Sequence, residues 1–145
     1  MLFDPENPII KLCAHGMELE GEGKSTEALS VFQQAWNEAG NNLEKFSAAH
    51  YIARHQNSVA DKLKWDKTAL HLALDMKDEG IKGAYPSLYL NIAKCYEDLN
   101  DFDNTKLNYE LALSYAGFLL EDGYGNMIKA GIANGLGRVE LARQA

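Results

Sequence analysis

The fold is decided by one stretch of sequence and by its copies. The first copy runs from Gly16 to Gly40 and reads GMELEGEGKSTEALSVFQQAWNEAG. The second runs from Ala93 to Gly117 and reads AKCYEDLNDFDNTKLNYELALSYAG. Small residues, an aromatic residue and a final glycine recur in both at identical spacing, as Gly16, Ala28, Phe32, Ala35 and Gly40 and as Ala93, Thr105, Tyr109, Ala112 and Gly117. Such a pattern predicts a helix-turn-helix unit that stacks on copies of itself.

A less regular copy of the pattern lies between these two, and its corresponding positions are Ala53, Leu70, Ala73 and Gly80. The distance from Ala53 to Ala73 is one residue longer than in the other copies, which indicates an insertion within residues 57–64. A register that uses Ala69 in place of Ala73 remains open. With Ala35, Ala73 and Ala112 as equivalents, the copies are 38 and 39 residues apart.

The composition favours helices throughout. Leu and Ala number 19 and 18, whereas Val and Thr number three each, and a chain of 145 residues suggests one domain, residues 1–145. The net charge of −7 leaves no basic stripe, so we expect no nucleic-acid partner. Because no signal peptide or membrane-spanning run is visible, we expect a cytoplasmic protein that binds no membrane. Cys13 and Cys95 are expected to be buried free thiols.

Turn and capping residues divide the chain into seven expected helices. We expect Asn7 to cap the first helix and Asn41 with Glu44 to form a capping box before the third, which covers about 43–56. The sixth helix is expected to end near Glu121. A last helix over about 126–143 contains several glycines, so we expect it to pack against the sixth helix and cap the array.

These residues resemble the tetratricopeptide repeat (TPR) family. The repeats cover about 9–42, 46–80 and 86–119, and their spacing resembles the longer-repeat type of kinesin light chains and bacterial regulator arrays. The resemblance implies an all-α fold: a right-handed superhelical stack of three TPR-like helix-turn-helix repeats plus a C-terminal capping helix. In that family the first helix of each repeat lines a concave groove. Among the groove positions carried over to this sequence, the residues expected to bind a partner are His50, Tyr51, Arg54, Asn57, Asn91 and Lys94.

The groove suggests a protein- or peptide-binding adaptor. Arg54 and Lys94 together with Asn91 are suited to hold a carboxylate or an acidic peptide segment, because charged donors bind carboxylates strongly. An ordinary solvated helix face is the alternative interpretation. A second hypothesis is a self-associating module, a possible homodimer that pairs through the glycine-rich last helix. An enzyme or a small-molecule sensor, with a pocket at His50 and Arg54, is the least favoured hypothesis.

Motifs that carry chemistry are otherwise missing from the sequence. Gly21–Ser25 ends like a phosphate-binding loop, but it lacks the first glycine and a preceding strand. His50 and His55 are five residues apart, which places them on different sides of a helix, so they are poorly placed to share a metal. We therefore expect no catalytic residues, no cofactor and no metal site.

Overall fold

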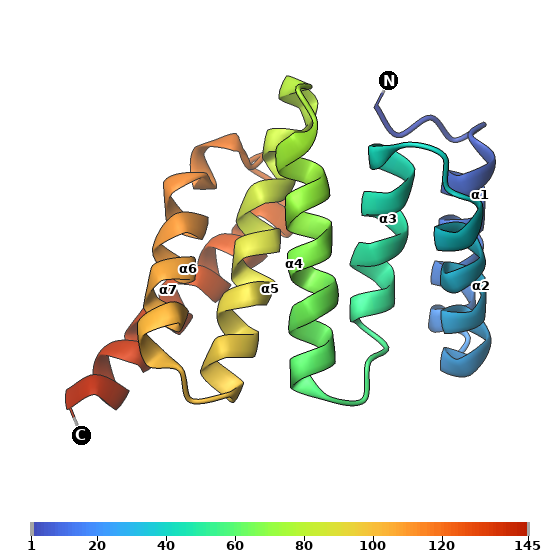
Figure 1. Cartoon of the computed structure of the whole chain (residues 1–145). Helices are drawn as coiled ribbons and strands as arrows, with labels where there is room; N and C mark the ends of the chain where they lie inside the picture. The colour runs from blue at the N-terminus through green and yellow to red at the C-terminus, as the bar shows by residue number, and fades with distance from the viewer. Residues whose placement is uncertain (1, 145) are drawn as a thin grey trace. The chain divides into compact units, whose positions relative to one another are not determined.

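The computed structural model describes residues 2–144 and is all-α, as the composition predicts. Within these residues there is no strand (Figure 1). The helices are α1 (Pro8–Gly21), α2 (Ser25–Glu38), α3 (Asn42–Ala53), α4 (Val59–Asp75), α5 (Tyr85–Asp98), α6 (Phe102–Ser114) and α7 (Gly123–Gln144), with the 3₁₀ turns η1 (Glu79–Ala84) and η2 (Ala116–Phe118). No helix in this part of the chain is both long and apolar enough to cross a membrane.

The helices group into two compact units, Met1–Lys77 and Asp78–Ala145. The first contains α1 to α4, and the second contains η1, α5, α6, η2 and α7. Each unit is described by itself below. The sequence prediction of a single domain stays a prediction.

Local capping sets the helix starts. Asn7 Oδ1 accepts hydrogen bonds from the backbone N–H groups of Ile9 and Ile10, so the first expected cap is confirmed. The expected capping box is present in a shifted form: Asn41 Oδ1 accepts from the Glu44 N–H, while Glu44 Oε1 accepts from the N–H of Gly40, one residue before the cap, instead of from that of Asn41. These bonds fix where α1 and α3 begin, and therefore which of their residues face each other.

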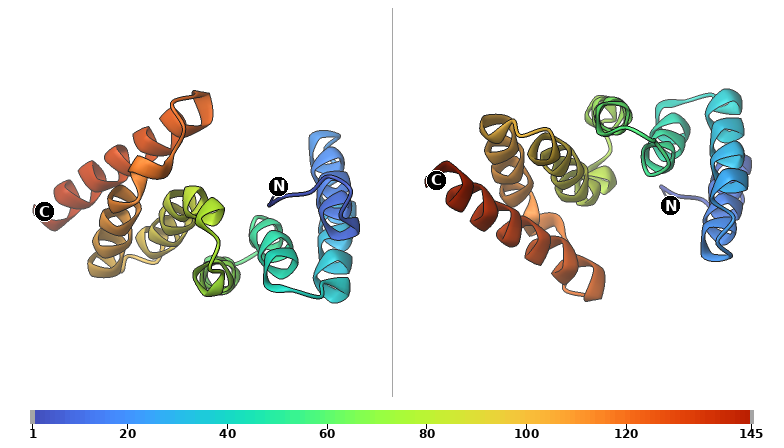
Figure 2. Two further views of the ribbon diagram at one scale, coloured as in Figure 1. Left: turned by 90° about the horizontal axis from the view of Figure 1, so that it is seen from above. Right: turned by 90° about the horizontal axis from the view of Figure 1, so that it is seen from below.

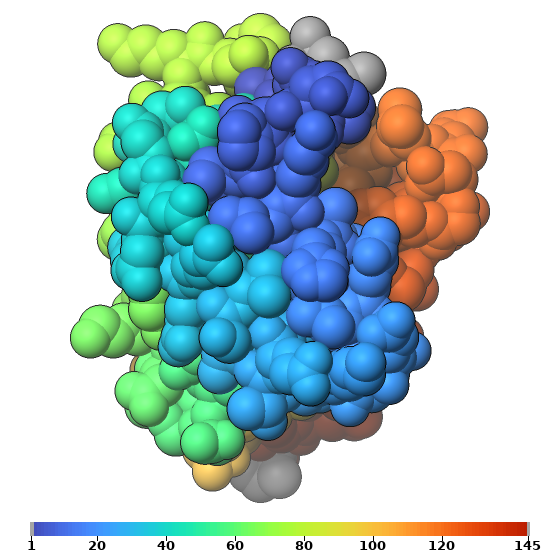
Figure 3. All heavy atoms as spheres, turned by 90° about the vertical axis from the view of Figure 1, so that its right-hand side faces the viewer, coloured from blue at the N-terminus to red at the C-terminus, as the bar shows by residue number. Residues whose placement is uncertain are grey.

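In the first unit α1 packs against α2, α2 against α3, and α3 against α4 (Figure 1). The small residue and the aromatic of the repeat meet here, because a Cβ atom added at Gly16 would overlap the ring of Phe32. Phe32 is fully buried. The glycine thus lets α1 approach α2 closely, as the repeat pattern predicts. On the α1–α2 side of this unit, the side chains form a continuous surface (Figure 3).

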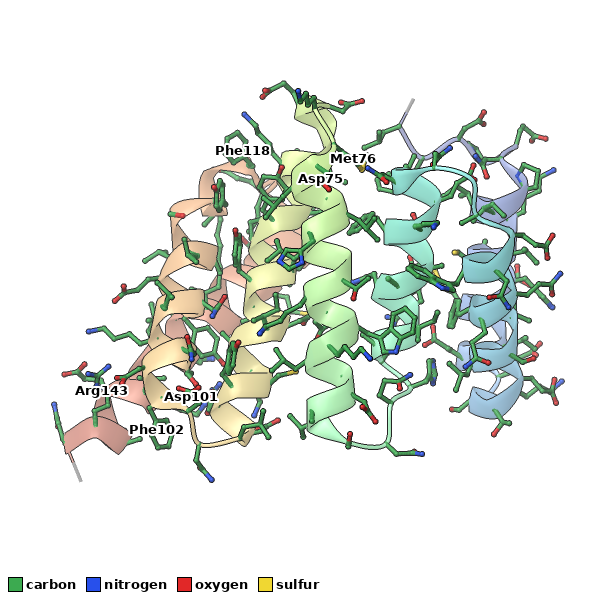
Figure 4. The ribbon with its side chains drawn as sticks, viewed as in Figure 1. Asp75, Met76, Asp101, Phe102, Phe118 and Arg143 are labelled. Atoms are coloured by element: carbon green, nitrogen blue, oxygen red, sulfur yellow. The ribbon has the colours of Figure 1, made fainter. Side chains whose placement is uncertain are left out.

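In the second unit α7 packs against both α5 and α6 (Figure 2). Tyr109 of α6 is fully buried and shares a cluster with Ala93 of α5 and Val139 of α7. A Cβ atom added at Gly135 of α7 would overlap the Tyr109 ring. The expectation that the last helix packs against the sixth is confirmed. Near the end of α7, Arg143 forms an ion pair of 3.3 Å with Asp103, close to Asp101 and Phe102 at the start of α6 (Figure 4).

Three expected helix boundaries differ from the structure. The third helix ends at Ala53 rather than near residue 56, and the sixth ends at Ser114 rather than near Glu121. The last helix begins at Gly123 instead of near residue 126. Its start is early because Asp122 acts as an unforeseen cap: Asp122 Oδ1 accepts from the Gly125 N–H at 2.7 Å, which holds two poor helix formers in the first turn. In the middle repeat, Ala69 and Ala73 are both fully buried.

Candidate functional site

Three of the predicted groove residues lie together at the C-terminal end of α3, His50 and Tyr51 in its last turn and Arg54 as its C-cap. The ring of Tyr51 stacks on Phe32 with centroids 5.0 Å apart, which holds it against α2. The guanidinium of Arg54 lies over the Tyr51 ring at 4.7 Å, and the His50 ring meets it edge-on at 5.3 Å. Tyr51 is therefore half-buried and acts as the support on which His50 and Arg54 are placed.

Arg54 is bound to a carboxylate of the chain itself. Arg54 Nη2 donates to Glu20 Oε1 at 2.9 Å, and His55 Nε2 lies 2.7 Å from Glu20 Oε2. Glu20 belongs to α1, so this cluster ties the C-terminal ends of α1 and α3 together. The sequence reasoning proposed Arg54 as a carboxylate ligand but did not foresee that Glu20 occupies part of its binding capacity, with His55 as a second partner.

His50 has an unusual environment. Its Nδ1 atom is buried and has no hydrogen-bond partner within the described residues. Burial, and then the positive charges of Arg54 and Lys62, lower the pKa of His50 to about 4. The imidazole is therefore neutral at neutral pH and keeps one buried polar atom unsatisfied, which is an uncommon and costly arrangement.

The remaining predicted residues lie elsewhere. Asn57 is exposed in the turn between α3 and α4. Asn91 is half-buried on α5 in the second unit, and Lys94 is exposed one turn later on the same helix. Lys94 Nζ forms an ion pair of 2.7 Å with Asp98 Oδ1. The structure thus brings together His50, Tyr51 and Arg54 in the first unit. Asn91 and Lys94 form a separate polar surface on α5 in the second unit.

A network that the sequence reasoning missed lies in the second unit. Arg138 of α7 donates to Glu97 of α5 through Nε at 2.7 Å and through Nη2 at 3.1 Å. Tyr109 Oη donates to Glu97 Oε1 at 2.8 Å and accepts from Arg138 Nη2 at 3.2 Å. The bonds from Arg138 and Tyr109 hold the pKa of Glu97 below its usual value.

The two units repeat one arrangement. In each, a small residue of the first helix, Gly16 or Ala93, lies against a buried aromatic, Phe32 or Tyr109. A carboxylate four residues later, Glu20 or Glu97, binds an arginine of the second α-helix after its own, either Arg54 at the C-cap of α3 or Arg138 within α7. The equal spacing of glutamate and small residue in the two copies was the signal available in the sequence.

Groups suited to catalysis or to metal binding are scarce. Among residues 2–144, no group of three or more His, Cys, Asp or Glu side chains could hold a metal ion. Cys13 and Cys95 are buried and neither is part of a disulfide, as expected. Burial raises the pKa of Cys13 to about 11, so this thiol is a poor nucleophile at neutral pH. One pocket of about 170 Å³ in the second unit is lined by Gly83, Phe118, Leu119, Leu120, Asp122 and Tyr124. It is smaller than the roughly 300–1,000 Å³ of ordinary ligand sites.

Comparison with known proteins adds no relative. No family model, no curated protein and no solved structure matches the chain. The functional interpretation therefore depends on the residues and contacts described above.

Proposed function

We propose that the chain is a TPR-like helical scaffold in the cytoplasm that binds a carboxylate-bearing segment of a protein or peptide partner without catalysing a reaction. The repeated arrangement of small residue, aromatic, glutamate and arginine in the two units supports a repeat scaffold. The contact residues of this surface are His50, Tyr51, Arg54 and Asn57 of the first unit. In the second unit, Asn91 and Lys94 form a second candidate contact surface of their own.

The single observation that carries this proposal is the unsatisfied Nδ1 of His50 beside Tyr51 and Arg54. An unpaired buried polar atom destabilises a folded chain by about 1–3 kcal/mol. Because Nδ1 is covered in the free chain, a partner gains this affinity when its binding turns the His50 ring outward and supplies the missing hydrogen bond. A neutral imidazole nitrogen is suited to a peptide N–H or a hydroxyl group. An extended segment provides such groups at regular intervals.

Arg54 supplies the charge for recognition. A guanidinium carries five N–H donors in a fixed fork, and the bond to Glu20 uses only part of them. A partner carboxylate can bind the remaining donors while Glu20 keeps the guanidinium in place over Tyr51. The net charge of −7 repels strongly acidic chains at long range, so the favoured partner carries one or two carboxylates rather than a long acidic tail.

Peptide display against the immobilised chain tests this proposal. We expect the wild type to select peptides with a recurrent Asp, Glu or free terminal carboxylate, and Arg54→Gln or His50→Phe to weaken their binding by roughly tenfold. Arg143→Gln is a matched control, because Arg143 is a partly exposed arginine with one ion pair outside the proposed surface. Equal selection by the wild type and by both test variants would rule out this surface as the binding site.

A further inference from the structure

The outer face of α7 is an apolar helix face that no other part of the described chain covers. Met127 and Leu141 are 60% and 71% exposed. Ala130, Asn134 and Gly137 are exposed between them. Because these five residues follow one another at intervals of three and four, they lie on one side of the helix. We name this set of residues the α7 stripe.

The opposite side of α7 is already used inside the second unit. Ile128, Ile132 and Val139 are buried, and Gly135 faces the ring of Tyr109. A Cβ atom added at Gly137, in contrast, meets nothing within 4 Å. The α7 stripe is therefore distinct from the packing face, and its small residues leave room for a second helix to approach closely.

Two charges flank the α7 stripe along one edge. Lys129 and Glu140 are eleven residues apart, which is about three turns and 20° around the axis, so both lie on the same edge. Within residues 2–144, Lys129 forms no ion pair, and Glu140 Oε1 accepts only from the Gln144 amide at 3.3 Å. On the other edge, Arg138 is bound to Glu97.

The positions of these residues are symmetric about Asn134. The midpoint between Met127 and Leu141, between Ala130 and Gly137, and between Lys129 and Glu140 lies in each case within one residue of Asn134. We propose that the α7 stripe pairs with the α7 stripe of a second copy of this chain, antiparallel, about a two-fold axis at Asn134.

Charge complementarity selects a second copy as the occupant. In an antiparallel pair related by this axis, the same edge of each helix lies next to that of its partner, and the order of residues along it is reversed. Lys129 of each copy therefore lies beside Glu140 of the other. Met127 then covers Leu141, and Ala130 lies against Gly137. This pairing is separate from the binding of a partner segment at His50 and Arg54, and either can fail without the other.

The first test is the molar mass as a function of concentration, measured by light scattering. As the concentration increases, we expect the molar mass of the wild type to rise from 16.1 kDa toward twice that value. Lys129→Glu and Glu140→Lys should each raise the dissociation constant by roughly tenfold, and the double variant should return it to within about twofold of the wild type. Lys64→Glu, which makes the same charge change at an exposed position of α4, should leave the dissociation constant unchanged. Circular dichroism checks that all variants fold.

The second test is oxidative cross-linking, which is sensitive to direction. Asn134→Cys places two thiols at the axis and should give a disulfide-linked dimer. Met127→Cys should not, because the two copies of residue 127 then lie about 21 Å apart along the helices. Cys13 and Cys95 are buried and do not compete. A wild-type mass that stays at 16.1 kDa, charge reversals that the double variant does not rescue, or equal cross-linking at both positions would overturn the proposal.

Discussion

Arg138 holds both carboxylate oxygens of Glu97, through Nε at 2.7 Å and Nη2 at 3.1 Å, and thereby joins α7 to α5. The contact also satisfies the hydroxyl of Tyr109, whose ring is fully buried between them. The equivalent bond in the first unit joins Arg54 to Glu20. In both units a charge pair at the rim completes the packing of a buried aromatic.

Removing the charge of Glu97 should destabilise the second unit. Glu97→Gln keeps the shape but weakens the bonds to Arg138 and Tyr109, so we expect the free energy of unfolding to fall by about 1–2 kcal/mol. The loss is modest because the Arg138 side chain is 47% exposed and solvent screens the pair. Urea unfolding monitored by circular dichroism measures the change. The control is Asp98→Asn, which breaks an exposed ion pair with Lys94. It should lower the free energy of unfolding by less than about 0.5 kcal/mol. Similar losses for the two variants would contradict the role given to Glu97.

The glycines of α7 should respond in opposite ways to alanine. Gly135→Ala places a methyl group against the Tyr109 ring, so we expect a loss of about 1–3 kcal/mol from overpacking. Gly137 faces open space on the same helix, and Gly137→Ala should gain about 0.5–1 kcal/mol through helix propensity. Thermal and urea unfolding at one low protein concentration compare the two. Both variants exchange glycine for alanine on the same helix. An equal loss of stability at the two positions would therefore show that α7 does not pack through Gly135.

Sequence reasoning predicts the local parts of this fold well. The contact of Gly16 with Phe32 and the caps at Asn7 and Asn41 follow from short-range patterns, since each depends on a few residues at fixed spacing. The early start of α7 was missed because Asp122 offsets two glycines that predict a break.

The polar contacts between helices were harder to predict. The bond from Arg54 to Glu20 spans 34 residues, and the bond from Arg138 to Glu97 spans 41. Such pairs depend on how the helices are placed in space, which a repeat pattern gives only coarsely. Burial of the His50 Nδ1 depends in the same way on neighbouring side chains, so the sequence indicated the residue but not its unsatisfied state.

Glu44 should contribute to stability through the two contacts that it makes in the first turn of α3. Its Oε2 accepts from Asn7 Nδ2 at 2.9 Å, and its Oε1 accepts from the Gly40 N–H at 2.9 Å. Glu44→Ala removes both contacts, so we expect a loss of about 1 kcal/mol in urea unfolding. Glu38→Ala changes an exposed glutamate on α2 and should stay within about 0.5 kcal/mol of the wild type. A Glu44 variant as stable as the Glu38 variant would show that the box does not stabilise the helix start.

His50 should make the chain less stable in mild acid. Its pKa is about 4 in the folded state against 6.5 for an ordinary histidine, so the unfolded chain takes up the proton first as the pH falls. The free energy of unfolding should therefore decrease from about pH 6.5 and level off near pH 4, by at most about 3 kcal/mol.

His50→Phe cannot be protonated and should remove most of this slope, whereas His71→Gln, on the exposed side of α4, should retain it. Urea unfolding between pH 6.5 and 5 measures the slopes, because the lowered pKa values of Glu44 and Glu97 shift their own contributions to more acidic pH. Parallel slopes for the wild type and His50→Phe would show that the pKa of His50 is the same in the folded and unfolded chain, which would contradict the burial of this imidazole.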